Sequence, residues 1–170
     1  MVKISKYNHD GVKDRDVPQV LIDSIVDRIE GTMFEDMLKQ SDVIRTLREV
    51  GWDEKVAIGK HCRHSIDGIL EEVGVCVYFG HSQGAFQKLL SLQSLFEDGQ
   101  MYRCYYITQS ATMAALRHRL VNPAAKPGTN GNRITYEDLV SGMDYYSRFI
   151  TVPMTIIGLE VSEDNFLNHV

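Results

Sequence analysis

The sequence has little cysteine and no long apolar run, and each shortage argues against a class of protein. The three cysteines are odd in number and lie far apart, which argues against a disulfide framework and for a reducing cytoplasm. No apolar run approaches the ~20 residues that a membrane-spanning helix needs, and residues 1–10 lack the apolar core of a signal peptide. We therefore expect a cytoplasmic protein without a membrane segment.

The sequence also has fewer basic than acidic residues. The chain has 18 basic and 23 acidic residues, for a net charge of −5. A general polyanion binder normally carries a basic excess, so any nucleic-acid surface here must be local. The 170 residues are 44% hydrophobic and 24% charged, which is typical of a globular chain with a buried core. No repeat or linker divides them, and we expect a single domain over residues 1–170.

The hydrophobic pattern predicts helices and strands in a mixed order. Apolar residues at helical spacing predict helices over 18–50, interrupted at Gly31 and closed at Gly51. After a central hairpin, the pattern predicts a helix over 85–96, a strand over 102–108, a helix over 111–120, a helix opening at 135 and a strand over 152–161. This order predicts an α/β domain with a mixed central sheet flanked by helices.

The central hairpin carries the most informative residues. Apolar residues alternate with Gly, Cys and Tyr over 73–80, which is the pattern of a strand with one apolar face. Residues 65–70 are predicted as its partner strand, joined through a turn at 71–72. The alternation places Cys76 and Tyr78 together on the opposite face.

Several stretches of sequence, taken with this order, carry a resemblance to a known family. They are Tyr7-Asn8-His9, Gly51-Trp52-Asp53-Glu54, Ile66-Asp67, Val75 to Gly80, Tyr105 to Thr108, Tyr145-Tyr146, Val152-Pro153 and Ile157-Gly158-Leu159. The chain resembles the BglII/BstYI/BamHI group of type II restriction endonucleases, which share a PD-(D/E)XK core. The resemblance spans most of the chain and rests on spacing more than on identity. It implies a restriction-endonuclease-like fold descended from a Mg²⁺-dependent enzyme that cleaves double-stranded DNA.

The same resemblance assigns catalytic positions to Asp67, Cys76 and Tyr78. In the family, an aspartate on one strand meets a glutamate on the next, two positions before a glutamine or lysine. Asp67 occupies the aspartate position, whereas Cys76 and Tyr78 stand at the other two. Mg²⁺ prefers carboxylate and other oxygen ligands, so a thiol and a phenol are poor substitutes. We therefore expect a cleft that both side chains face, with metal binding at Asp67 weak or lost and catalysis lost or impaired.

Two other enzyme hypotheses remain open. An active Mg²⁺-dependent nuclease would pair Asp67 with a relocated acid, Glu71 or Glu72, although exposed glutamates are the commoner reading of such residues. The helical region offers Glu30 and Glu35 for the same role. An unrelated α/β enzyme would use Cys76 as a nucleophile, although nothing in the sequence indicates a lowered pKa.

A zinc site is a further alternative, suggested by His61, Cys62 and His64. A structural zinc site needs four nitrogen or sulfur ligands in paired short spacings, and only one such pair exists here. Ordinary histidines and small buried cysteines explain these residues better.

The best local basic patch brackets a long loop over 122–132, and long loops in compact domains are often functional. Its members are Arg117, Arg119, Lys126 and Arg133. As DNA-binding residues they would contact phosphates, which positions a protein without specifying sequence. As helix-terminal cations they would simply offset the dipole. The expected partners are double-stranded DNA and, through the apolar helix over 85–96, a second copy of the chain or a nuclease-related protein.

Overall fold

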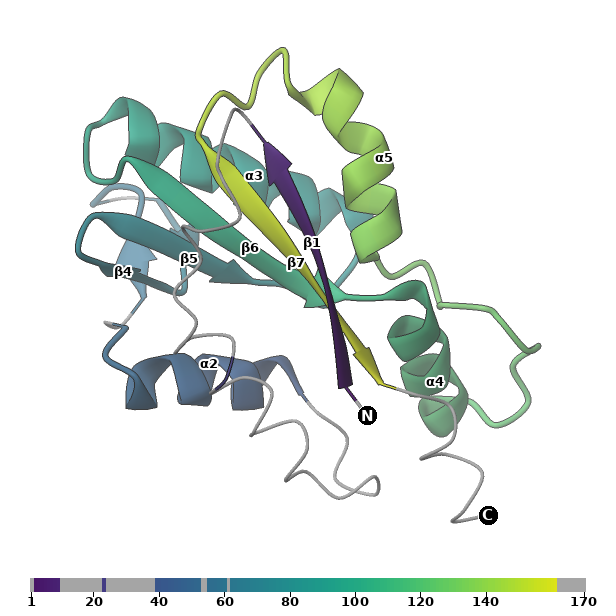
Figure 1. Ribbon diagram of the computed structural model, residues 1–170. Coiled ribbons are helices and arrows are strands. Elements are labelled where there is room, and N and C mark those ends of the chain that lie inside the picture. The colour runs from purple at the N-terminus through teal and green to yellow at the C-terminus, as the bar shows by residue number, and fades with distance from the viewer. Residues whose placement is uncertain (1, 10–22, 24–38, 53–54, 61, 162–170) are drawn as a thin grey trace.

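The computed structural model describes residues 2–9, 23, 39–52, 55–60 and 62–161, which include a five-stranded mixed sheet (Figure 1). Its strands, in spatial order, are β1 (Val2–His9), β7 (Met154–Val161), β6 (Arg103–Gln109), β5 (Val73–Val77) and β4 (Gly68–Leu70). The three central strands are mutually parallel, and β1 and β4 pair antiparallel at the two edges. The mixed sheet expected from the sequence is confirmed.

Helices cover both faces of this sheet. On one face lie α2 (Gln40–Glu49) and α4 (Ala111–Val121), and on the other lie α3 (Ser82–Glu97) and α5 (Tyr136–Tyr146). These bounds confirm the helices predicted over 85–96 and 111–120 and the one opening at 135. A two-stranded ribbon, β2 (Val56–Ala57) with β3 (Ser65–Ile66), lies outside the main sheet. None of the described helices is long and apolar enough to cross a membrane.

Each face of the sheet has its own apolar core, and β5 contributes to both. Val75, Val77 and Phe79 pack with α2, whereas Cys76 packs with α3 and α5. The alternation of residues 73–80 is therefore confirmed in phase. Parallel strands that are covered on both faces bury successive side chains, so neither face of β5 is left to solvent.

The predicted partner strand over 65–70 is wrong as a single strand. It is split at Asp67 into β3, which pairs with β2, and β4, which pairs with β5. The physical reason is that the Asp67 side chain, rather than a further stretch of backbone, takes the next amide of β5. The turn at 71–72 is confirmed, with φ of 48° at Glu71 and 61° at Glu72.

The hydrophobic pattern did not predict β1, because apolar and polar residues are mixed in this strand. Residues 2–9 form the edge strand that pairs with β7. An edge strand buries less of its surface than a central one, so its hydrophobic signal is weak. The helix predicted over 18–31, the beginning of the next one, and Glu30 and Glu35 lie outside the described residues.

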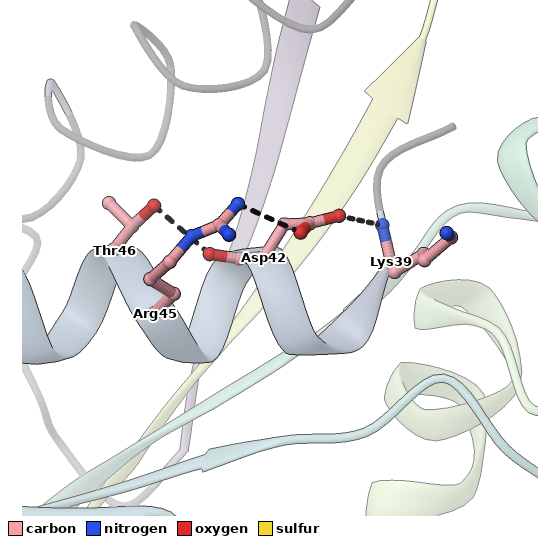
Figure 2. A network of polar contacts seen from close by, with 4 residues as sticks. All are labelled: Lys39, Asp42, Arg45 and Thr46. Carbon is pink, nitrogen blue, oxygen red and sulfur yellow. Dashed lines mark hydrogen bonds and ion pairs between the residues drawn. The ribbon is translucent and has the colours of Figure 1, made fainter. Parts of the chain in front are cut away.

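The start of α2 is fixed by Asp42, and the end by glycine. The Asp42 carboxylate accepts the Lys39 amide hydrogen at 2.8 Å and pairs with Arg45 at 3.0 Å (Figure 2). A carboxylate in the first turn also interacts favourably with the helix dipole. Gly51, with φ of 96°, follows the last turn, which confirms the predicted end. This helix holds Val43 and Leu47 against β5.

One buried amide side chain ties α3 to the segment that precedes β7. Gln93 Oε1 accepts the backbone amide hydrogens of Thr151 at 2.8 Å and Val152 at 3.0 Å. Gln93 Nε2 donates to Thr151 Oγ1 and to the Glu97 carboxylate. Gln93 is 6% exposed and Val152 is fully buried, whereas Thr151 is exposed, so the Val152 amide is the donor with little access to water.

We expect Gln93→Leu to destabilise the protein by about 1–3 kcal/mol, because it leaves the backbone amide of the buried Val152 without an acceptor. The measurement is the free energy of unfolding from urea denaturation. Gln87→Leu is the matched control, because the exposed Gln87 lies on the same helix. Equal effects of the two substitutions would contradict the assigned role of Gln93.

Candidate functional site

The candidate site is built around Asp67, at the break between β3 and β4. The Asp67 amide donates to Val75 O at 3.0 Å, which continues the β4–β5 ladder by one residue. Its carboxylate Oδ2 then accepts the Val77 amide hydrogen at 2.8 Å. Asp67 is 3% exposed. The carboxylate is therefore part of the sheet's hydrogen bonding and is turned away from water.

Cys76 lies beside Asp67, on the α3 face of β5. Its side chain is fully buried in the core formed with α3 and α5. Burial raises the pKa of the Cys76 thiol well above its usual value, and the Asp67 carboxylate, within hydrogen-bonding reach, raises it further. Cys76 is therefore a neutral thiol at physiological pH and a poor nucleophile.

The expectation that Cys76 faces an open cleft is wrong. Because β5 is covered by helices on both faces, the position next to Asp67 is filled by core packing. Tyr78, on the same face, is only partly buried. Its ring lies against Gly80 and Gly84, where an added Cβ would overlap it. The lack of side chains at these two positions gives the ring its place at the start of α3.

Lys88 and Tyr106 also belong to this cluster, although neither was predicted from the sequence. The charge of Lys88, on α3, opposes the rise in the Cys76 pKa, and its ammonium donates to Ser65 O. The Tyr106 hydroxyl is buried and has no hydrogen-bond partner within the described residues. Burial raises the pKa of Tyr106, and Cys76, Tyr78 and Asp67 raise it further.

A signal for Lys88 was available in the pattern of α3. Ala85, Leu89 and Leu92 form the buried stripe of this helix, and Lys88 falls on it between them. A lysine within an apolar stripe indicates a buried polar partner. Tyr106 had no comparable signal, because aromatic residues are common in central strands.

The residues around Asp67 do not fit a magnesium ion. A single carboxylate, already bonded to a backbone amide, stands beside a thiol and a phenol, whereas Mg²⁺ requires near-octahedral oxygen coordination. Glu71 and Glu72 lie exposed in the β4–β5 turn, roughly 13 Å from Asp67 along the strand, from a rise of about 3.3 Å per residue. Within the described ranges, no three His, Cys, Asp or Glu side chains gather at one place.

The cysteines are all free, and they differ in exposure. Cys62 is exposed, whereas Cys76 and Cys104 are buried on neighbouring strands. Burial raises the pKa of Cys104 as well. For the zinc alternative, Cys62 and His64 are exposed and His61 lies outside the described residues.

Of the four predicted basic residues, the structure brings two together. The Arg117 guanidinium lies over the Phe79 ring, 5.0 Å from its centre, and Arg133 Nη1 donates to Phe79 O at 3.2 Å. Arg119 is half-buried in the last turn of α4, and Lys126 is exposed in the loop beyond it. The basic residues therefore lie on α4 and the loop that follows, with Arg117 and Arg133 anchored at the end of β5.

Comparison with known proteins gives a family and a related fold. The model of the family "Restriction endonuclease BglII/BglIII" matches residues 26–159. Among solved structures, the restriction endonuclease BglII in complex with a DNA 16-mer has a TM-score of 0.66 and 14% sequence identity, covering 95% of this chain and 77% of that one. No curated protein matches the sequence. The structural likeness, at this identity, establishes a restriction-endonuclease-like fold.

We expect one fast-reacting thiol in the native protein. Iodoacetamide should modify Cys62 quickly, whereas Cys76 and Cys104 should react only when the protein unfolds, because both are buried and neutral. Mass spectrometry of peptides after timed labelling measures this. Cys62→Ser, the control, should abolish the fast reaction. Rapid labelling of Cys76 in that variant would contradict the assigned burial and favour Cys76 as a nucleophile.

Proposed function

The chain belongs to the BglII/BglIII family of restriction endonucleases, and we propose that it binds double-stranded DNA without cleaving it by Mg²⁺-dependent chemistry. The observation that carries the loss of cleavage is the engagement of Asp67. Its carboxylate accepts the Val77 amide hydrogen and faces the Cys76 thiol in a buried place. A metal-dependent nuclease needs carboxylate oxygens free to hold an ion near the phosphate.

The residues at the other two family positions support the same proposal. Cys76 is neutral and enclosed, and Tyr78 packs against glycines at the start of α3. Neither supplies the negative oxygen ligands that attract a hard cation. The alternative, an active nuclease that uses Asp67 with Glu71 or Glu72, has no support from their placement, because the turn that carries them lies at the far end of β4.

DNA binding is supported by the family and by the distribution of positive charge. The similar BglII structure was solved with DNA bound. In this acidic chain, basic residues gather locally on α4 and the following loop: Arg117, Arg119, Lys126 and Arg133. Such residues contact backbone phosphates and position a protein on the duplex. Binding of this kind weakens steeply with salt, because each phosphate contact releases a counterion.

We further propose that the protein is a cytoplasmic homodimer, with a nuclease-related protein as the alternative partner. Exposed apolar side chains on or next to α3 and α5 support association: Phe86, Leu90, Tyr145 and Phe149. Three free cysteines support a reducing compartment.

We expect the purified protein to bind a fluorescent DNA duplex and to leave supercoiled plasmid intact in Mg²⁺ or Mn²⁺. Fluorescence anisotropy should show affinity that falls between 50 and 200 mM salt, and gel electrophoresis should show no nicking. Asp67→Ala is the control for contaminating nuclease. Cutting by the wild type that disappears in Asp67→Ala would establish the active-nuclease alternative. Absence of any DNA binding would remove the proposed function altogether.

We expect the double substitution Cys76→Glu with Tyr78→Gln to create metal affinity at Asp67. The second carboxylate should destabilise the protein in EDTA, because two buried acids repel, and Mg²⁺ or Mn²⁺ should recover much of the loss. Thermal unfolding with titrated metal measures both effects. Cys76→Gln with Tyr78→Gln has the same shape without the charge and should not respond to metal. A folded double variant that also does not respond would contradict the assignment of these positions.

A further inference from the structure

Two arginines from distant parts of the chain meet at one residue, Phe79, just beyond the end of β5. Arg117, from α4, places its guanidinium over the Phe79 ring. Arg133, which follows the long loop, donates from Nη1 to the carbonyl of the same residue. Phe79 itself is held in place, because its amide donates to Gln40 and its carbonyl also accepts from Gln109. Both guanidinium groups therefore contact a residue that is itself held in place by hydrogen bonds.

No acid neutralises this pair within the part of the chain that the structure describes. Arg117 Nε and Nη1 are buried and lack a hydrogen-bond partner there, and the charge of Arg133 acts directly on Arg117. The pKa of Arg117 is lowered by burial first and by Arg133 second. Two guanidiniums close enough for one charge to act on the other repel, and an anion placed between them would offset that repulsion.

The geometry also limits which anion fits. A guanidinium presents its donors in a planar fork, which matches the paired oxygens of a phosphoryl group. Both side chains are only partly buried, so an anion can reach them from outside, at donors other than the buried Arg117 Nε and Nη1. The contacts with the ring and the carbonyl of Phe79 restrict the rotation of the two side chains.

We propose that Arg117 and Arg133 together hold one phosphoryl group. The proposal rests on the proposed function for its expected source, a backbone phosphate of DNA. A terminal phosphate of a DNA end and inorganic phosphate offer the same chemistry. Arg119 and Lys126 lie outside this site and would contribute general attraction instead.

The test measures the salt dependence of DNA binding by the full chain in four forms: wild type, Arg117→Met, Arg133→Gln and the double variant. Met keeps an apolar cover over the Phe79 ring. The double variant should reduce the slope of log K against log salt by about 0.9, the value for one phosphate. Each single substitution should reduce the slope by less, because the remaining arginine still contacts the same phosphate. Arg148→Met, in an exposed position after α5, is the control and should leave the slope unchanged.

Three ligands separate the sources of the phosphoryl group. They are a duplex without terminal phosphates, the same duplex with 5′-phosphates, and inorganic phosphate. The salt slope is measured with each duplex. The effect of inorganic phosphate is measured by thermal unfolding at constant ionic strength. A slope change with the first duplex indicates a backbone phosphate. A change only with the second indicates a DNA end. Stabilisation by inorganic phosphate that Arg117→Met abolishes indicates a site independent of DNA.

The remaining outcomes distinguish a failure of this inference from a failure of the proposed function. DNA binding with the same slope in all forms, with no stabilisation by phosphate, means that the two arginines hold no phosphoryl group. A double variant whose slope falls by about 1.8, the value for two phosphates, means two separate phosphate contacts. If the wild type binds no DNA but phosphate stabilises it through Arg117, the proposed function fails and the phosphoryl site stands.

Discussion

The hydrogen bond from the Val77 amide to the Asp67 carboxylate is the contact on which the centre of the molecule depends. It ends β4 and separates it from β3, and it keeps the aspartate inside the sheet. An acid bonded to a backbone amide tolerates burial far better than an unpaired one. The same bond holds Asp67 beside Cys76, so the position that the resemblance assigns to a metal ligand becomes part of the core.

Core packing limits which side chain can stand at position 76. A glutamate at position 76 would need a cation or solvent, because β5 is covered on both faces. A thiol needs neither, and it fits among Ala85 and Leu89 of α3 without an unpaired charge. A thiol at position 76 therefore suits the buried core better than a carboxylate would. Stability and metal binding place opposite demands on the same side chain.

Much of the fold could be predicted from the sequence, because periodicity reports burial directly. The phase of residues 73–80 and the helices after them follow from this pattern. The break at Asp67 could not be predicted, since it depends on a side chain that substitutes for backbone pairing. The edge strand β1 was not predicted, because its residues do not form a strong apolar face. At the site, the neighbouring Asp67 and Cys76 were predicted, but the burial of Cys76 and the meeting of Arg117 with Arg133 are products of tertiary packing.

The pairing of β1 with β7 also bears on the order in which the molecule assembles. It joins the first described strand to the last, so β1 has no strand partner until β7 has been synthesised. Until then, the amide and carbonyl groups of residues 2–9 cannot enter the sheet, and contacts between such distant segments form slowly. On the ribosome, β5, β6 and α3 emerge before β7, so β1 can complete the edge of the sheet only after they have been made.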